Sequence, residues 1–456
     1  MENQHLVIIG ASISGLAAAA AASEHFARIT LIERDRLVET AEPRAGVPQG
    51  TQIHALLPVG LERLEDLLPG VTDDLLAAGC DTFDEQADCP LLSSVGWRMR
   101  VKSLPTIAFR RPLLELVIRR RVLSLGNVTV VYGSARGLVL SDDQRRVEGV
   151  RLRDGSVIAA DLVIDSSGRR TRSPDWLTEH GYDKPTEVRA EAYMGYATQF
   201  VRIPEDVLGD IRGIVALPIP GHLKGGVLLP ADNGVHSLSA VGMMRDYPPR
   251  EQGAFLEFLD QAPTPLLGAI ARRSEPVSDI RIYHQAGNLR RKWEAVVGPD
   301  RFLAVGDAVA SFNPVYGQGI TLAASAGTLL REALAAGPTL DGLGRRVQDM
   351  LANIVDDAFS MSAAVDATFP GVQLVNFTAP TDEEIRIATA LEELATVDAK
   401  ISYALGEATW YIRPEVLETP EVHASVERWL AAGRTAAQID PARYPQEVIE
   451  LDGVLQ

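Results

Sequence analysis

Cysteine is nearly absent from this sequence of 456 residues, which contains only Cys80 and Cys89. Two cysteines exclude a multi-bridge disulfide framework and a cysteine-rich metal site, and their spacing is not that of a C-x-x-C redox pair. Proteins without disulfides are typical of reducing compartments, so we expect a cytoplasmic protein. The eight histidines are scattered without H-E-x-x-H or a similar spacing, and we therefore expect no metal site.

Positive charge is also scarce, because 44 Lys and Arg face 61 Asp and Glu and leave a net charge of −17. Nucleic acids and anionic membrane surfaces are bound by clustered Lys and Arg, so the deficit disfavours both as partners. Beyond the alanine-rich opening, no apolar run approaches the roughly 18 residues of a membrane helix. The opening lacks the basic start of a signal peptide, and we expect no integral membrane segment. At about 150 residues per domain, the length predicts two or three lobes.

The opening stretch, Leu6–Ala22, reads LVIIGASISGLAAAAAA and is soon followed by the apolar run Ile29–Ile32. This order predicts a strand, a glycine turn, a helix and a second strand. Glu33 ends the second strand, about 20 residues beyond the turn, where dinucleotide-binding folds carry an acid. We expect Gly10 to make the turn, Gly15 to allow close packing of helix and strand, and Glu33 to accept a ribose hydroxyl. The N–H groups at the helix start would face a pyrophosphate.

Ser12 stands where the G-x-G-x-x-G pattern has its middle glycine. Its Cβ restricts the approach of a phosphate, although its hydroxyl can still donate a hydrogen bond. The alternative is an ordinary helix start, with Ser12 as the cap and Glu33 as a solvated turn acid.

Arginines follow in two places. Arg44 lies in an irregular Pro- and Gly-rich connector and is a candidate to neutralise a pyrophosphate; the alternative is a mobile loop with a solvated Arg44. Helical spacing then covers Ala55–Leu68. Arg110 and Arg111 precede Pro112, which suits the first position of a helix. Because a helix N-terminus disfavours cations, this pair suggests an anionic partner, with a solvated basic edge as the alternative.

Later stretches repeat the pattern of a strand that ends in a polar turn. Asp165 closes the apolar run in DLVIDSSGRRTR, and Phe302–Val305 leads to Asp307. We expect Asp307 to hold polyol hydroxyls as a buried acceptor, with Glu33 only partly exposed. Period-2 runs from Glu187 to Met244 predict an antiparallel sheet in a second, substrate-covering lobe. After about residue 340 helical spacing dominates. In the helix predicted to start at Pro112, Glu115 and Arg119 are spaced as a favourable i,i+4 pair.

In this order and at these separations, the motifs GASISG with Glu33, Arg111, DLVIDSSGRRTR and FLAVGDAVASFNPVYGQGI resemble the FAD-dependent monooxygenases of the aromatic-hydroxylase (para-hydroxybenzoate hydroxylase-like) superfamily. RAGVPQG at Arg44, followed by His54, and NPVYGQG are most similar to the actinobacterial branch that contains the polyether epoxidases. The resemblance covers about residues 1–345. It implies an α/β fold with a FAD-binding Rossmann-like (GR2-type) domain, an antiparallel-sheet substrate domain and a helical C-terminal region. The implied boundaries are 1–75, 104–185 and 285–345 for the FAD-binding domain, 76–103 for an excursion into the substrate domain, 186–284 for the substrate domain, and 346–456 for the C-terminal region.

The resemblance also implies a set of residues that contact FAD. These are Gly10, Ser12, Gly15, Glu33 and Arg34 at the ADP half; Arg44 and Arg111 at the pyrophosphate; Asp165 and Gly168 in the second fingerprint; Asp307 at the ribityl chain; and Pro314, Gly317, Gly319 and Ile320 at the flavin ring. No side chain is expected to act as a general acid or base. The backbone of Pro314 is the one group placed beside the reacting face.

The implied reaction uses NADH or NADPH as a transient reductant and O₂, forms a flavin C4a-hydroperoxide, and epoxidises or hydroxylates a small apolar substrate of the polyketide or terpenoid class. A second Rossmann fingerprint for the nicotinamide is not found in the sequence. The main alternative is a FAD-dependent reductase or dehydrogenase acting on a carbon–carbon double bond. A flavin halogenase would carry a W-x-W-x-I-P stretch, which is not found, and a non-enzymatic protein like the prenyl-GTPase escorts would not need the intact Asp307 and GQG. The oligomeric state stays open.

Overall fold

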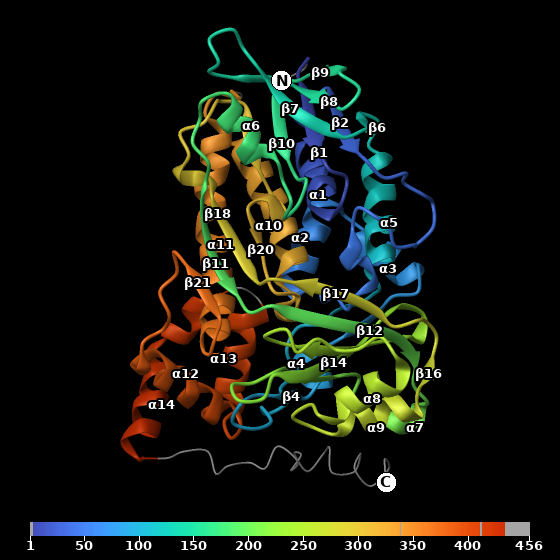
Figure 1. Ribbon diagram of the computed structural model, residues 1–456, viewed down its shortest axis with the longest axis vertical. Helices are drawn as coiled ribbons and strands as arrows, with labels where there is room; N and C mark the ends of the chain where they lie inside the picture. The colour runs from blue at the N-terminus through green and yellow to red at the C-terminus, as the bar shows by residue number, and fades with distance from the viewer. Residues whose placement is uncertain (1–2, 338, 411–412, 434–456) are drawn as a thin grey trace.

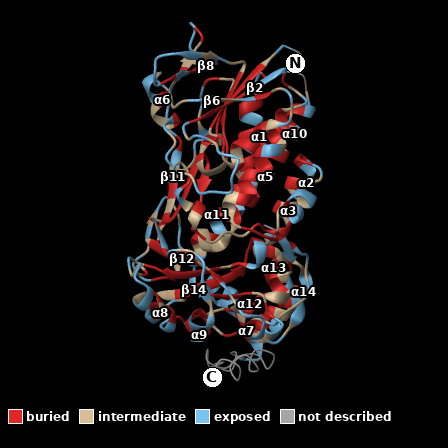
Figure 2. Ribbon diagram, turned by 90° about the vertical axis from the view of Figure 1, so that its right-hand side faces the viewer, coloured by how far each residue is buried: buried red, intermediate tan, exposed pale blue. Residues whose placement is uncertain are grey.

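The computed structural model describes residues 3–337, 339–410 and 413–433. Its first layer is a five-stranded sheet in the order β19-β10-β1-β2-β6, in which all neighbours are parallel. The strands are β1 (His5–Ile9), β2 (Arg28–Glu33), β6 (Val128–Tyr132), β10 (Leu162–Asp165) and β19 (Phe302–Ala304). Helices α1 (Ile13–Ala22), α5 (Arg111–Leu123) and α10 (Gln318–Ala335) pack beside it and are largely buried, as Figure 2 shows. The predicted β-α-β opening is confirmed.

Glycine allows α1 to lie close to β1. Gly10 has φ +106°, and a Cβ on Gly15 would stand 2.0 Å from the carbonyl oxygen of Gly10. Any larger residue at position 15 would force the helix away from the strand. The backbone therefore agrees with the expectation that Gly10 makes the turn and that Gly15 allows close packing.

The second layer is a seven-stranded sheet that lies across the lower half of Figure 1. Its path is β16-β12-β15-β14-β13-β4, with β17 also paired to β12, and only the β4–β13 pair is parallel. The strands are β4 (Leu91–Leu92), β12 (Met194–Arg202), β13 (Ile214–Ala216), β14 (Lys224–Pro230), β15 (His236–Gly242), β16 (Glu275–Pro276) and β17 (Arg281–Gln285). Helices α7 (Glu205–Leu208), α8 (Gln252–Asp260) and α9 (Leu266–Arg273) share a core with one face of this sheet.

A four-stranded antiparallel sheet, β20-β18-β11-β21, links the two layers. It consists of β11 (Thr186–Glu191), β18 (Asn288–Lys292), β20 (Ala310–Ser311) and β21 (Gln373–Val375). The period-2 run that begins at Glu187 was expected to form one sheet, but it divides between two. The division falls at Tyr193, whose φ of +46° breaks the extended backbone between β11 and β12.

The C-terminal region begins within α11 (Leu343–Ala367), so the expected boundary at 345/346 falls inside a helix. Its first turns join the core of the parallel sheet through Leu343, Val347 and Leu351. Helices α12 (Asp382–Ala395), α13 (Ala399–Trp410) and α14 (Pro420–Ala431) share a separate small core. The division into domains stays a prediction, and residues 434–456 lie outside the described part of the chain.

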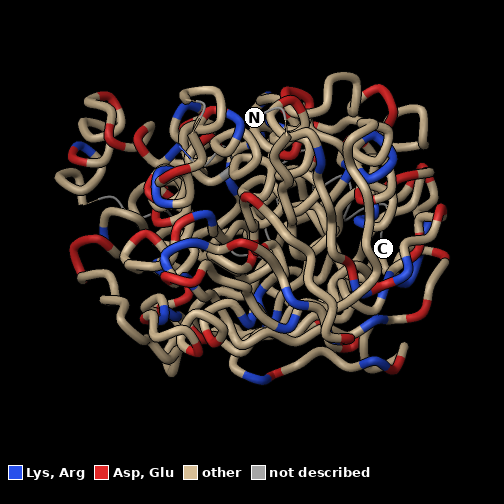
Figure 3. The backbone as a smooth tube through the Cα atoms, turned by 90° about the horizontal axis from the view of Figure 1, so that it is seen from above, with Lys and Arg blue, Asp and Glu red and all other residues tan. Residues whose placement is uncertain are grey.

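Smaller elements complete the fold. They are the pair β3 (Asp81–Phe83) and β5 (Thr106–Ala108), the three-stranded sheet β7 (Ala135–Leu140), β8 (Val147–Leu152) and β9 (Val157–Ala159), and the helices α2 (Pro58–Leu67), α3 (Val71–Ala77), α4 (Glu85–Asp88) and α6 (Ser173–Glu179). The expected helix Ala55–Leu68 begins only at Pro58, because Leu57 is extended. Acidic and basic residues are interspersed along the chain (Figure 3). Among the described helices, none is both long and apolar enough to cross a membrane.

Candidate functional site

The carboxyl ends of four parallel strands bring the predicted site residues to one edge of the first sheet. Ile9 is in register with Ile32 on one side and with Asp165 on the other, and Asp165 is in register with Ala304. The turns that follow these strands carry Gly10, Gly168 and Asp307, and Glu33 is the last residue of β2. Ligands of open parallel sheets bind at this edge, where strand order changes direction.

The first turn is held by Glu33, a residue that is 5% exposed. Its Oε2 accepts a hydrogen bond from the Ala11 N–H at 3.0 Å. The hydroxyl of Ser14, in the first turn of α1, is buried and has no partner among the described residues. A Cβ on Gly306 would stand 2.3 Å from this hydroxyl, so the two turns are in close contact. Ser14 was not predicted, although it lies inside the glycine motif.

Arg44 lies among three carboxylates. Its Nε donates to Glu115 Oε1 at 2.7 Å, and its Nη1 is 3.1 Å from both Asp35 Oδ2 and Glu33 Oε2. Burial acts to lower the pKa of Arg44, but Glu115 and Glu33 outweigh it and the pKa is raised. Arg34, by contrast, is exposed and donates to the Gly46 carbonyl at 3.2 Å.

Glu115 is a site residue that sequence reasoning missed. It is buried on α5 and accepts a hydrogen bond from the Ser12 hydroxyl at 2.9 Å as well as from Arg44. Glu115 was predicted to pair with Arg119. In the structure the two side chains have other hydrogen-bond partners: Arg119 donates to the carbonyl of Val38, and Glu115 accepts from Arg44 and Ser12. Helical spacing alone reveals neighbours on α5 but cannot reveal which other elements cover that face.

The two predicted arginines at the start of α5 separate. Arg110 forms an ion pair with Asp232, with Nη2 to Oδ2 at 2.6 Å, so the expectation that both face an anionic ligand is wrong for Arg110. Arg111 begins the helix, with Pro112 second, and its Nη2 donates to the Ser12 hydroxyl at 3.0 Å. Its Nε is buried without a partner among the described residues. Burial lowers the pKa of Arg111, against the effect of Glu115 and Asp307.

His54, which follows the RAGVPQG motif in the sequence, lies beside Arg111. Its Nδ1 is 2.9 Å from the Gln52 carbonyl, which can only accept, so Nδ1 carries the proton. Its Nε2 then accepts from Arg111 Nη1 at 3.4 Å. Burial and the neighbouring guanidinium lower the pKa of His54 to about 3, so the ring is neutral at physiological pH.

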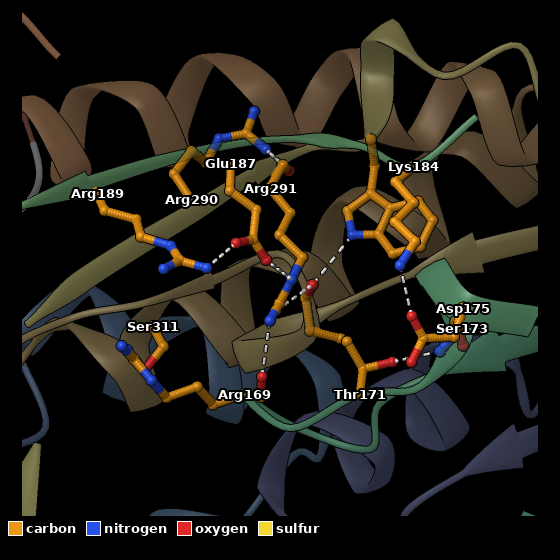
Figure 4. Close-up of polar contacts among 12 residues, drawn as sticks. Arg169, Thr171, Ser173, Asp175, Lys184, Glu187, Arg189, Arg290, Arg291 and Ser311 are labelled. Carbon is orange, nitrogen blue, oxygen red and sulfur yellow. Dashed lines mark hydrogen bonds and ion pairs between the residues drawn. The ribbon is translucent and has the colours of Figure 1, made fainter. Parts of the chain in front are cut away.

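Asp307 is half-buried in a short turn after β19 and accepts no hydrogen bond from the described residues. Burial raises its pKa, opposed by the nearby guanidinium groups of Arg111, Arg169 and Arg291. Figure 4 shows how two of these are held: Arg291 donates to Glu187 Oε1 at 3.0 Å and to the Arg169 carbonyl at 2.8 Å, and Arg169 donates to the Ser311 hydroxyl at 3.0 Å. Asp307 is thus an acceptor with open capacity in a cationic setting.

Asp165 is used differently. It is fully buried, and it accepts hydrogen bonds from the Ser167 N–H at 2.8 Å, the Ser167 hydroxyl at 2.6 Å and the Thr171 hydroxyl. Gly168 follows with φ +87°. Because both oxygens of Asp165 already have protein donors, any effect on a ligand acts through the turn that they shape.

The predicted ring-edge residues lie in the loop before α10 and in the first turn of that helix. Pro314 begins a single 3-10 turn, Gly317 has φ +66°, and Ile320 is buried in the first turn of the helix. A Cβ on Gly317 would lie 3.2 Å from that of Ala55, whereas a Cβ on Gly319 would meet nothing within 4 Å. The start of α10 therefore has open space beside Gly319, where its free N–H groups favour electron-rich atoms.

These residues fit FAD. A diphosphate matches Arg111 with its unpartnered Nε and the unpartnered Ser14 hydroxyl, a polyol matches the open carboxylate of Asp307, and a ring edge matches the space at Gly319. Arg44 would have to exchange one of its three carboxylate partners for a phosphate. In the described part of the chain, no group of three or more His, Cys, Asp or Glu side chains is arranged to hold a metal ion.

Comparison with known proteins places the chain in a family. No family model matches the sequence. Protein Rv3254 of Mycobacterium tuberculosis (strain ATCC 25618 / H37Rv) is 33% identical over 347 residues, which cover 73% of each chain. The chain belongs to the family of this protein. A shorter stretch of 54 residues is 48% identical to the amino acid oxidase fsqB of Aspergillus fumigatus and covers 12% of this chain and 11% of that one.

Solved structures identify the fold. PqsL, a probable FAD-dependent monooxygenase from Pseudomonas aeruginosa, superposes with a TM-score of 0.64 at 16% identity and covers 81% of this chain and 97% of its own. The flavin-dependent brominase Bmp2, as a triple mutant, gives 0.61 at 14% identity over 98% of both chains. 2-Methyl-3-hydroxypyridine-5-carboxylic acid oxygenase gives 0.57 at 18% identity, covering 80% of this chain and 91% of that one. The fold is that of the aromatic-hydroxylase-like FAD-dependent monooxygenases.

Proposed function

We propose that this protein is a FAD-dependent monooxygenase that uses NADH or NADPH and O₂ to oxygenate a small apolar substrate. The observation that carries the proposal is the meeting of Arg111, Ser14 and Asp307 at one sheet edge, each with an unused hydrogen-bonding atom. When bound, FAD supplies the redox chemistry that activates oxygen, and the protein supplies binding, orientation and exclusion of water. The predicted cofactor residues keep this role as part of the proposal.

The parts of the site have separate tasks in this proposal. Arg111 and Arg44 neutralise the diphosphate, with Glu115 orienting Arg44 and the Ser12 hydroxyl. Asp307 accepts hydrogen bonds from the ribityl hydroxyls; burial raises its pKa, and Arg111, Arg169 and Arg291 act in the opposite direction and favour the ionised carboxylate. The loop from Pro314 to Gly319 and the start of α10 receive the ring, and a helix N-terminus stabilises electron density there.

In this proposal the substrate lies beside an apolar cluster. Met194, Tyr196 and Val241 of the seven-stranded sheet share one buried cluster with Met243, which follows β15, and with Phe369. Val315 of the ring-edge loop packs against this cluster. An apolar cluster between sheet, loop and the end of α11 favours an apolar substrate and keeps water away from the reacting atoms. Epoxidation or hydroxylation of a polyketide or terpenoid, as in the polyether epoxidase-like branch, is the finer form of the proposal.

The test is oxygen isotope incorporation. The FAD-loaded protein is incubated with NADPH, ¹⁸O₂ and a panel of terpenes and polyenes, and the product masses are measured by mass spectrometry. We expect a product that gains one heavy oxygen atom; a matched reaction in H₂¹⁸O with ordinary O₂ should give no label, which excludes simple hydration. Product formed equally well without oxygen, with gain or loss of hydrogen, would contradict the monooxygenase and support the reductase alternative.

A further inference from the structure

A buried carboxylate on α11 connects the C-terminal region with the ring-edge loop. Asp366 lies one residue before the end of α11 and is 1% exposed. Its Oδ2 accepts hydrogen bonds from Asn288 Nδ2 at 2.8 Å and from Asn313 Nδ2, and its Oδ1 accepts from the Tyr316 hydroxyl at 2.7 Å. Asn313 and Tyr316 stand on either side of Pro314. One carboxylate therefore holds both ends of the turn that would lie beside the flavin.

The turn is held through its backbone as well. The side-chain oxygen of Asn288 accepts a hydrogen bond from the Asn313 N–H at 2.7 Å, and both asparagines are fully buried. Asn313 faces Asp366 with its amide nitrogen, which donates to Oδ2 of Asp366. Its oxygen is then directed elsewhere, and it is buried without a partner among the described residues. An oxidised flavin ring carries one N–H donor of the kind that this oxygen lacks.

The carboxylate of Asp366 is unusual in having only neutral partners. Within the described residues, no ion pair joins it to Lys, Arg or His, and the hydrogen bonds to it come from two amides and one phenol. A buried carboxylate with no counter-ion costs free energy that a hydrophobic residue of similar volume would not cost. A residue that served packing alone would have no need of this arrangement. The three donors instead give the turn a defined geometry.

We propose that Asp366 is a positioning residue that holds the turn Asn313–Gly317 in the conformation that receives the flavin ring, with Asn313 Oδ1 left as an acceptor for a ring N–H. The inference rests on the FAD binding proposed above. It makes the start of the C-terminal region part of the cofactor site. That role was not evident from the sequence, where residues 346–456 matched the resembled family least securely.

The test compares three substitutions in the full-length protein. Asp366→Leu removes all acceptors, Asp366→Asn keeps the shape and one accepting oxygen, and Asp356→Asn is a matched control on the same helix. Asp356 is half-exposed and pairs with Arg290 at 2.9 Å. FAD affinity is measured by fluorescence titration, the bound flavin by its absorbance bands, and folding by the melting temperature without FAD.

We expect Asp366→Leu to raise the dissociation constant for FAD about tenfold or more, which corresponds to about 1.4 kcal/mol, and to shift the flavin absorbance bands. Asp366→Asn should restore affinity to within about threefold, since an amide oxygen still accepts hydrogen bonds. The control, Asp356→Asn, should have the same FAD affinity and flavin absorbance as the unsubstituted protein. If Asp366→Leu fails to fold, Tyr316→Phe keeps the test valid, because it removes one donor and should weaken FAD binding and shift the same bands.

The outcomes separate this inference from the proposed function. A lower melting temperature of Asp366→Leu with unchanged FAD affinity and absorbance would show a merely structural role and overturn the inference. So would Tyr316→Phe with unchanged affinity and absorbance, in the case where it replaces Asp366→Leu. Either result would leave the monooxygenase proposal standing. Failure of the unsubstituted protein to bind FAD would overturn both.

Discussion

At the scale of single residues, two acids at strand ends differ in how much the fold depends on them. Glu33 is 5% exposed, accepts the Ala11 N–H at 3.0 Å and pairs with Arg44 at 3.1 Å. Asp307 is half-buried and accepts no hydrogen bond from the described residues. The expectation of a partly exposed Glu33 is therefore wrong, whereas Asp307 is shielded enough for burial to raise its pKa. The glycine turn closes over Glu33, whereas among the described residues no donor reaches the Asp307 carboxylate in the turn after β19.

This difference predicts distinct effects of removing each carboxylate. Asp307→Ala should weaken FAD binding by about 1.5–3 kcal/mol, the usual range for hydrogen bonds to a charged group, and should lower the stability of the protein without FAD only slightly. Glu33→Ala should lower that stability clearly, because it leaves the Ala11 N–H and Arg44 without a partner that they have in the fold. Denaturant unfolding without FAD and flavin titration measure the two effects. Equal losses of stability in both variants would contradict the prediction.

At the scale of elements, the contact between α11 and the ring-edge turn should make stability depend on pH. Burial raises the pKa of Asp366 to about 7, although Tyr316, Asn313 and Asn288 donate to it. The other titratable groups that bear on it are the phenols of Tyr316 and Tyr196, whose pKa values burial raises well above the ordinary value. Both phenols stay neutral, so Asp366 is the group that titrates here.

The sign follows from the raised pKa. The stability contributed by the neutral carboxyl is fully present below about pH 4, the unfolded pKa, and is lost as the pH rises through about 7. Asp366→Asn should abolish this loss. Relative to the unsubstituted protein, the free energy of unfolding of this variant should therefore increase as the pH rises from 4 to 7, by about 1.4 kcal/mol for each unit of pKa shift. Urea unfolding at several pH values measures the difference. A constant difference across this range would count against the prediction.

At the scale of the whole molecule, the C-terminal helices contact the segment that precedes and follows β4. Arg98, near β4, binds Glu392 of α12 with Nε to Oε2 at 2.9 Å and a second, parallel hydrogen bond. The N–H of Met99 donates to the Ala395 carbonyl at 2.8 Å, and the Ser402 hydroxyl donates to the Met99 carbonyl at 2.6 Å. Figure 1 shows α12, α13 and α14 beside the lower sheet. The segment 76–103 is therefore a link between the two.

Arg98→Met should loosen α12–α14 without unfolding the parallel sheet, because these helices have their own core. The bidentate, largely buried ion pair between Arg98 and Glu392 should contribute on the order of 1–3 kcal/mol, more than an exposed pair. Hydrogen exchange should accelerate in α12–α14 and stay unchanged in β1 and α1. Arg386→Met, which breaks an exposed pair within α12, is the control and should have little effect. Faster exchange throughout the chain would contradict a local attachment.

The sequence by itself determined the sheet edge at which we propose that the cofactor binds. The turn at Gly10, the close packing at Gly15 and the strand ends at Glu33, Asp165 and Asp307 were all predicted and are found at one sheet edge. Their signals are local, since a strand, a glycine turn and a helix follow one another within a few residues. Parallel strands then bring their carboxyl ends together whatever the rest of the chain does.

Only the tertiary structure decided which polar side chains meet across elements. Glu115 binds Arg44 instead of Arg119, Arg110 binds Asp232, and Asp366 reaches the loop around Pro314 from α11. Each of these pairs joins residues 50 to 122 positions apart. Helical or strand periodicity indicates which face of an element is covered, but the partner on that face depends on the packing of the layers, because a buried charge must find its donor or acceptor wherever the fold places one.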